Sequence, residues 1–299
     1  MTATRTPRPR PAIRALAAAT ALIAVFVLAG CSQDDTATAQ AAATTTASLP
    51  SQHVHAIARD PGDGTVKLAT HDGLFTLTTG GTWQQIGPAI DLMGFTVTGP
   101  GNYYASGHPD PDTGLPEPAG LLHSVDAGKT WTALSRGGQS DFHALTASTR
   151  GVVGFDGGLR HSSDGRSWRT GAIPAPVRSL GAAPDGARVL ATTEQGVLAS
   201  SDHGRTWTAV PGAPMLLLVA WADDTTAVGI SPAGQVSIST DAGNTWRTTQ
   251  HTLAGPEALS AIRTPGGGLE ILAVASAGVV SSTDRGATFK PVTPAPPTR

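Results

Sequence analysis

An eight-residue pattern recurs along the chain, with Ser at its first position, Asp at the third, Gly at the fifth, Thr at the seventh and an aromatic residue at the eighth. Four full copies begin at Ser124, Ser200, Ser239 and Ser282. A fifth copy, beginning at Ser162, is one residue shorter, and a degenerate copy ends in a tryptophan at position 83. The closing aromatic residues recur at intervals of roughly forty residues, which is the length of one small supersecondary unit. We therefore expect the chain to consist of about six such units.

The chemistry of the pattern is that of a turn between two strands. We expect the Asp carboxylate to accept hydrogen bonds from the backbone amides two and three residues further on, and the Gly to adopt a positive φ. The aromatic residue opens the outgoing strand and can pack on a neighbouring sheet. The alternative is that these carboxylates bind calcium or act as catalytic acids. All copies look alike, however, as expected if each copy needs these residues to form the same turn. The aspartates predicted to be structural are Asp126, Asp164, Asp202, Asp241 and Asp284.

Composition and alternation favour an all-β fold. Charged residues make up 14% of the chain, which also holds 36 Gly and 23 Pro, as suits many short strands joined by turns. Residues 177–183, 188–193, 197–201 and 207–210 read as the four strands of one repeat. The innermost strands of the successive repeats are expected to start near His55, Met93, His143, Arg178, Leu218 and Leu259. We predict a single β-propeller of about six four-stranded blades over residues 51–295, followed by a tail, 296–299. A seventh blade would need a strand pairing that the sequence does not reveal.

The repeat resembles the Asp-box, or BNR repeat, of sialidases and sortilin-type receptors. The segment from His53 to Pro61, together with residues 69–75, is also similar to exported bacterial Asp-box proteins described as glycosyl-hydrolase-like. The resemblance implies a propeller. For a sialidase it would also imply an arginine triad, a Tyr–Glu nucleophile pair and an Asp acid.

That catalytic set is not found in the sequence. The two tyrosines, Tyr103 and Tyr104, are adjacent on one predicted strand, so that alternation sends them to opposite faces. The four glutamates, Glu117, Glu194, Glu257 and Glu270, do not complete a pair with them, and the arginine expected near the first strand is missing. We therefore interpret the chain as a non-enzymatic module. The alternative is a glycoside hydrolase with non-standard catalytic residues, for which Asp72 and Asp110 are the candidate carboxylates.

The first fifty residues carry signals for export. Four arginines lie within the first fourteen residues, and an apolar run follows over 15–29. The run ends in Leu-Ala-Gly before Cys31, which resembles the lipobox of bacterial lipoproteins. The resemblance implies that residues 1–30 are a signal peptide and that Cys31, the only cysteine, receives a diacylglycerol and further acyl chains such as palmitate. Residues 31–50, rich in Ala, Thr and Ser, then form a flexible tether. We expect the protein on the extracytoplasmic face of a bacterial cell membrane.

Six of the nine histidines lie between residues 53 and 143, within the first three repeats. Aligned inner strands place His55, Met93 and His143 at equivalent positions of successive blades, with Arg178 in the fourth. Equivalent positions lie around the central axis, so these side chains are expected to converge. His71 and His108 each end a second strand. The candidate metal or ligand residues are His53, His55, His71, Met93, His108, His143 and Arg178.

Imidazole and thioether groups together suit copper, with zinc as a second choice. The alternative is that the histidines only fill a narrow channel and bond to backbone or water. The loop from Ser106 to Gly120 is the longest insertion, and its Asp110 and Asp112 could ligate calcium or form a solvated acidic loop. With a formal net charge of −2, the chain shows no sign of nucleic-acid binding. We predict a membrane-anchored binding or assembly module for a protein, peptide or glycan, with metal binding as its most specific form.

Overall fold

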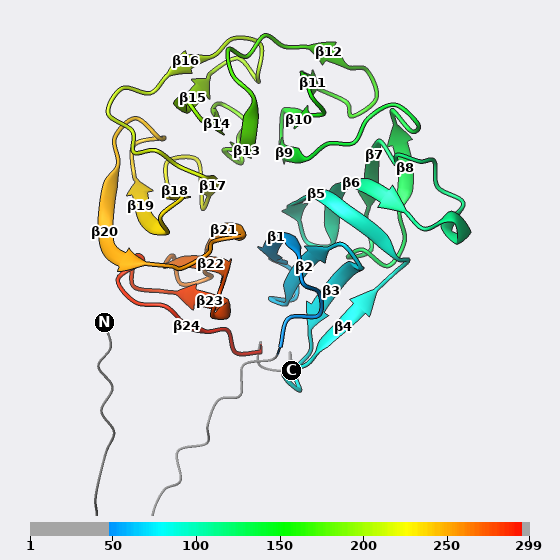
Figure 1. Cartoon of the computed structure of the whole chain (residues 1–299), viewed down its shortest axis with the longest axis horizontal. Coiled ribbons are helices and arrows are strands. Elements are labelled where there is room, and N and C mark those ends of the chain that lie inside the picture. Colours follow the sequence, from blue (N-terminus) through cyan, green and yellow to red (C-terminus); the bar gives the residue numbers. More distant parts are fainter. Residues whose placement is uncertain (1–47, 295–299) are drawn as a thin grey trace, which may run out of the picture. The chain divides into compact units, whose positions relative to one another are not determined.

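Six four-stranded antiparallel sheets surround a central axis in the computed structural model, which describes residues 48–294 (Figure 1). Each sheet is one blade of a β-propeller and is built from four strands that follow one another in the chain. The predicted signal peptide, Cys31, the tether up to residue 47 and the tail at 296–299 lie outside the described residues. Among the described residues, no helix has the length and hydrophobicity needed to cross a membrane.

The strands run from the axis outwards in chain order. The first three blades comprise β1 (Val54–Arg59), β2 (Val66–Thr70), β3 (Gly73–Leu77) and β4 (Trp83–Ile86); β5 (Ile90–Gly99), β6 (Asn102–Pro109), β7 (Leu121–Ser124) and β8 (Thr132–Ser135); and β9 (Ala144–Ser148), β10 (Gly151–Phe155), β11 (Leu159–Ser162) and β12 (Arg169–Thr170). The last three comprise β13 (Val177–Ala182), β14 (Val189–Thr193), β15 (Gly196–Ser200) and β16 (Thr208–Ala209); β17 (Leu218–Trp221), β18 (Ala227–Ile230), β19 (Gln235–Ser239) and β20 (Arg247–Thr252); and β21 (Ala258–Arg263), β22 (Leu269–Ala275), β23 (Gly278–Ser282) and β24 (Lys290–Pro291).

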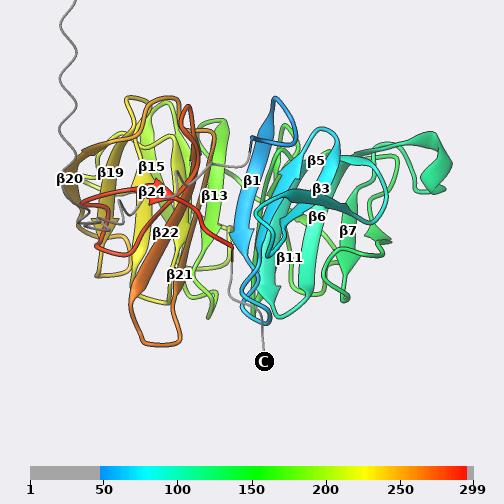
Figure 2. The same cartoon turned by 90° about the horizontal axis from the view of Figure 1, so that it is seen from below.

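The predicted fold class is confirmed, with six blades. All six inner strands begin within a few residues of the expected positions, and each inner strand contacts the inner strands on both sides of it. Viewed at right angles to Figure 1, the inner strands β1 and β13 run along the axis (Figure 2). The outermost strand of the fourth blade is shorter than expected, two residues in place of four, because β16 pairs with β15 only at Thr208 and Ala209.

The hydrophobic core is divided among the junctions between blades. Second strands such as β14 and β22 are buried along their whole length, as expected for strands covered on both faces. The junction that closes the ring joins the first blade to the sixth, where Val54 and Leu68 pack with Leu272 and Val274. Apolar burial at every junction therefore holds neighbouring blades together.

The repeated turn differs from its prediction in one respect. In the full copies the carboxylate reaches four residues ahead: Asp126 accepts bonds from the amide and the hydroxyl of Thr130, at 2.9 and 2.7 Å. The physical reason is that Ala127 and Gly128 both adopt positive φ, 63° and 86°, which loops the chain outward and directs the Gly128 amide to Ser124 Oγ. Only the shortened copy follows the prediction, with Asp164 accepting bonds from the amides two and three residues on.

The aromatic residue that closes each turn, a tryptophan in all copies except the last, packs on a neighbouring blade, as predicted. The half-buried ring of Trp207 contacts the cluster that contains Val153 and Leu159 of the third blade. Its indole N–H donates to the Gly204 carbonyl at 3.1 Å, so the ring is fixed to its own turn as well. Each turn of this kind therefore links two blades rather than capping one.

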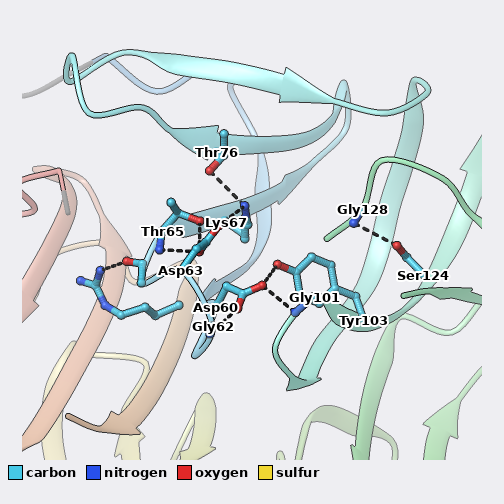
Figure 3. Close-up of polar contacts among 12 residues, drawn as sticks. Asp60, Gly62, Asp63, Thr65, Lys67, Thr76, Gly101, Tyr103, Ser124 and Gly128 are labelled. Carbon is cyan, nitrogen blue, oxygen red and sulfur yellow. Dashed lines mark hydrogen bonds and ion pairs between the residues drawn. The ribbon is translucent and has the colours of Figure 1, made fainter. Parts of the chain in front are cut away.

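Polar contacts join adjacent blades where the inner strands end. Figure 3 shows the Asp60 carboxylate facing the amides of Gly62 and Gly101 and the hydroxyl of Tyr103. Asp60 belongs to the first blade and Tyr103 to the second. Burial acts to raise the pKa of Asp60, but the hydrogen bonds from Tyr103 and the two amides outweigh it and hold that pKa below its usual value. This end of the channel is therefore held together by buried polar groups.

Candidate functional site

The opposite end of the channel, where the inner strands begin, is a mouth lined by residues of all six inner strands. His55, Met93, His143 and Arg178 line one cavity of about 420 Å³ there, together with Glu257. The sequence-based alignment of the inner strands placed the first four at equivalent positions, and the structure brings them to this cavity. Further along the axis a cavity of about 550 Å³ is lined largely by small residues of the same strands.

Three side chains at this mouth form a compact group of potential metal ligands, which we call the blade 1–2 cluster: His55, His71 and Asp91. One donor atom from each lies within 4.8 Å of the others. His71 Nδ1 lies 2.7 Å from Asp91 Oδ2, and His55 Nε2 lies 3.4 Å from Asp91 Oδ1. The latter two atoms are buried and have no hydrogen-bond partner. The exposed His53 meets His71 edge-on, with the ring centroids 5.2 Å apart.

The fold positions Asp91 through an irregularity in the second blade. The pairing of β5 with β6 shifts register between Asp91 and Gly94, which directs Asp91 towards the first blade. Gly107 makes the close approach possible: its φ is +153°, and a Cβ there would lie 1.8 Å from the Asp91 carbonyl oxygen. Asp91 is paired with His108 across these strands, so the same irregularity also places His108.

A second group, the blade 2–3 cluster, comprises His108, Glu117, Asp141 and His143. Asp141 Oδ2 lies 3.1 Å from His108 Nε2 and 2.5 Å from His143 Nε2. The other ring nitrogen of His108, Nδ1, lies 2.5 Å from Glu117 Oε1. The remaining carboxylate oxygen of Asp141 is buried without a partner. The hydrogen bond to Glu117, with further help from Asp141, raises the pKa of His108 although burial opposes the shift.

The lowered pKa of His55 keeps its imidazole in the neutral form that a metal ion requires. Burial lowers its pKa and outweighs the opposing effect of Asp91, and the neighbouring His71, His53 and His143 lower it further. A neutral imidazole offers a free ring nitrogen, and a metal ion needs its histidine ligands in that form.

All seven predicted residues therefore lie at or next to this mouth, while Asp91, Asp141 and Glu117 were not among the predicted ligands. A signal for the two aspartates is present in the sequence: each stands two residues before a position that faces the channel, Asp91 before Met93 and Asp141 before His143. His53 has the same relation to His55. Of these pairs only Asp91 and Met93 lie on one strand, β5, and the register shift between Asp91 and Gly94 interrupts the alternation there.

Other residues considered in the sequence have different surroundings. Tyr103 is fully buried, whereas Tyr104 stacks on His123 with the ring centroids 4.5 Å apart, so the two tyrosines do face opposite ways. Among residues 48–294, Asp72, Asp110 and Asp112 join no group of three potential metal ligands. Asp112 lies on a short 3-10 helix, η1 (Pro111–Thr113), and is exposed.

Comparison with known proteins supports the fold. No family model and no curated protein sequence matches the chain. An ancestral GH74 enzyme superposes with a TM-score of 0.53 at 13% identity, over 79% of this chain and 38% of that one. The extracellular domain of a hybrid two-component system of B. thetaiotaomicron gives a TM-score of 0.53 at 12% identity, over 83% and 34%.

YCF48, solved with a D1 peptide, superposes less closely, with a TM-score of 0.48 at 16% identity over 81% of this chain and 83% of that one. The chain spans little more than a third of the length of the first two proteins. At 12–13% identity, the similarity to the first two proteins supports a β-propeller fold and says nothing of the function, which must be argued from the site itself.

Proposed function

We propose that this chain is a lipid-anchored, extracytoplasmic binding module of the Asp-box type, and that its propeller binds a divalent transition metal ion, zinc or copper, at the histidine-rich mouth. One observation carries the proposal: His55, His71 and Asp91 come from two blades and place three donor atoms within 4.8 Å of one another. Two imidazole nitrogens and a carboxylate oxygen form a donor set that suits either metal.

The spacing of the donors supports a single ion between them. Ligand bonds of about 2.0–2.1 Å in a tetrahedral site place neighbouring ligand atoms about 3.3 Å apart. The separations of His71 Nδ1 from Asp91 Oδ2, 2.7 Å, and of His55 Nε2 from Asp91 Oδ1, 3.4 Å, lie on either side of that value and involve the two different oxygens of the carboxylate. Three protein ligands leave a coordination position for water or for a bound partner, and Met93, His143 and Arg178 line the cavity nearby.

A purely structural role for the histidines accounts less well for the buried atoms. His55 Nε2 and Asp91 Oδ1 are removed from solvent and make no hydrogen bond, although buried polar atoms are nearly always paired. A metal ion would satisfy both at once. The hydrogen bonds expected of a channel filler are missing at this position.

The anchor is supported by the sequence, where Cys31 directly follows the apolar run 15–29 and a small-residue pair. Metabolic labelling with a palmitate analogue tests it directly. We expect labelled protein in the membrane fraction, and we expect Cys31→Ala to lose the label. Label that persists in Cys31→Ala would contradict the anchor.

Calorimetric zinc and copper titrations of tag-free protein lacking residues 1–31, combined with elemental analysis, test the metal site. We expect His55→Ala and Asp91→Asn each to bind one equivalent fewer than wild type. His123→Ala is the matched control, because His123 bonds to Asn102 and lies outside both clusters. Equal stoichiometry in wild type and His55→Ala, or no binding by wild type, would overturn the proposal.

A further inference from the structure

The first and fourth blades carry the same irregularity at the mouth. In β1 the pairing with β2 skips His55, and in β13 the pairing with β14 skips Arg178. A bulge of this kind removes one side chain from the regular alternation and re-aims it. β1 and β13 lie on opposite sides of the axis (Figure 1). The fold therefore directs an imidazole and a guanidinium into one cavity from opposite sides.

Arg178 carries a charge that no carboxylate of the described chain neutralises. The arginines that form ion pairs within residues 48–294 are Arg59, Arg136, Arg160 and Arg263. Arg178 is exposed in the mouth, and among the same residues its side chain makes neither an ion pair nor a hydrogen bond. A guanidinium binds a carboxylate through two parallel hydrogen bonds. Arg178 is therefore available to a ligand that carries a carboxylate.

Glu257 supplies the opposite charge two blades further round the mouth. It directly precedes β21, lines the same cavity and is exposed, and its carboxylate forms no ion pair within the described part of the chain. Leu218 of β17 lines the cavity between the two charges. This half of the mouth thus presents a cation, an apolar residue and an anion in that order, whereas the other half presents His55, Met93 and His143.

The floor of the cavity is apolar. Six residues, one from each inner strand, line both this cavity and the larger one further along the axis, and we call them the apolar collar: Ala56, Phe95, Leu145, Leu180, Val219 and Leu259. A polar group placed against the collar would lose its hydration without gaining a partner, so the collar favours an apolar part of a ligand. The cavity volume of about 420 Å³ lies within the range of small-molecule sites, about 300–1,000 Å³.

We propose that the mouth binds a small zwitterion with an apolar body, namely an apolar amino acid or a dipeptide of such residues. Its carboxylate pairs with Arg178, its ammonium group pairs with Glu257, and its side chain rests on the apolar collar. Both end groups of such a ligand are charged at neutral pH. This inference names a ligand for the same mouth and rests on the proposed role as a binding module. It uses the fourth to sixth blades, however, and needs no metal ion.

Calorimetric titration of the full chain, purified without a tag and stripped of metal with EDTA, tests the ligand class. The probes are leucine and leucyl-leucine, which separate a free amino acid from a peptide. Three matched compounds each lack one feature: N-acetyl-leucyl-leucine has no ammonium group, leucyl-leucinamide has no carboxylate, and glycyl-glycine has no apolar body. We expect each of the three to bind at least about tenfold more weakly than leucyl-leucine.

Two variants assign the charges to residues. We expect Arg178→Gln and Glu257→Gln each to weaken leucyl-leucine binding at least about tenfold. Leucyl-leucinamide should bind wild type and Arg178→Gln equally, because the same contact is missing in both cases. Glu194→Gln is one matched control, since Glu194 is exposed in the turn after β14 and does not line the cavity. Arg247→Gln, on the outermost strand β20, is the other. Circular dichroism melting confirms that each variant is folded.

The outcomes separate this ligand from the metal ion. Binding of either probe that is lost in both charge variants supports the inference, even if no zinc binds. No heat with any probe, or binding unchanged by Arg178→Gln or Glu257→Gln, would overturn it. Binding that requires zinc and disappears in His55→Ala would place the ligand on the metal ion. That result would overturn this inference and leave the proposed metal site intact.

Discussion

Arg59 and Glu270 are 211 residues apart in the chain, yet the guanidinium of the first bonds to both carboxylate oxygens of the second, at 2.7 and 2.6 Å. The pair joins the first blade to the last, and its residues lie on β1 and β22, the strands that also carry Val54 and Leu272 of the apolar packing. The side chains are only 18% and 11% exposed, so the bidentate contact is largely sheltered from water. This ion pair, which we call the polar clamp, links the first and last blades at the junction where the ring closes.

Removing one partner of this clamp should destabilise the propeller. Glu270→Gln leaves the Arg59 charge half-buried without its counter-ion, and we expect a loss of about 2 kcal/mol in the free energy of unfolding. Urea denaturation measures it. Arg263→Gln is the control, because Arg263 occupies the corresponding position of β21 and its ion pair with Asp223 is more exposed, at 38% and 30%. That change should cost less than about 1 kcal/mol. Equal losses in the free energy of unfolding would show that the sheltered Arg59–Glu270 pair stabilises the protein no more than the exposed pair does.

Tyr103→Phe tests the contact between the first and second blades at this same end of the channel, opposite the histidine mouth. The Asp60 carboxylate would lose its buried hydroxyl donor, and we expect about 1–2 kcal/mol of destabilisation. Tyr104→Phe, the neighbouring residue on the opposite face, keeps the stacking on His123 and should be close to neutral. The prediction is contradicted if the thermal midpoints of both variants match wild type.

The repeated turns make stability sensitive to strong acid. Burial acts to raise the pKa of Asp202, but hydrogen bonds from Thr206 and Ser200 outweigh it and bring that pKa to about 2. A carboxyl with a depressed folded-state pKa stabilises the protein above its unfolded pKa of about 4 and loses that contribution as the pH falls to about 2. Asp202→Asn should therefore lower stability at pH 6 and have a shallower acid limb in melts between pH 4 and 2. A parallel shift at all pH values would argue against this titration.

Two histidines at the junction between the third and fourth blades should produce a second pH effect. Burial lowers the pKa of His161, assisted by His203, Arg205 and Arg169 against the opposing Asp202, and burial lowers that of His203 as well. Both are held neutral in the folded protein, so the unfolded chain binds more protons below its histidine pKa of about 6.5, and stability falls as the pH drops through and below that value.

His161→Gln/His203→Asn should reduce the slope of stability against pH between 7 and 5. His251→Gln provides the comparison: this residue lies on β20, away from that junction. Urea midpoints at four pH values decide the matter. A slope unchanged by the double variant would place the pH response elsewhere.

Trp207→Ala removes the ring that fixes one turn to the blade before it. The ring is half-buried against the cluster of Val153 and Leu159, so we expect a loss of about 3 kcal/mol, near the lower end for large aromatic deletions. Trp207→Phe should recover most of it, since the ring contact is kept and only the bond to Gly204 is lost. Thermal midpoints that do not separate these two variants would show that the apolar contact is secondary.

The fold was predictable because the turn pattern repeats. A Ser-Asp-Gly turn followed by Trp fixes the third and fourth strands of each blade, and the remaining strands follow by spacing, as in β13 and β14. The hydrogen bonds that Asp126 accepts from a residue four positions ahead were missed. They depend on a positive φ at Ala127, a residue type for which that conformation is rare.

The site was predictable only in part. His55 and His143 follow from aligning inner strands, because equivalent positions must meet at the axis. Asp91 depends on a register shift in β5 and on the space left by Gly107, and neither can be read from alternation. Glu117 reaches the mouth from a loop whose path has no periodic signal. Contacts set by bulges and loops therefore required the structure, whereas contacts set by the repeat did not.

Every blade consists of four strands that are contiguous in the chain, and among residues 48–294 no strand is exchanged between the first and last blades. Propeller size can thus change by whole units: duplicating or deleting one segment of roughly forty residues cuts no strand pairing. New termini can likewise be opened between two blades, because no strand pairing joins one blade to the next within residues 48–294. The histidine mouth is an exception to this modularity, since its clusters require the first three blades to remain in their present order.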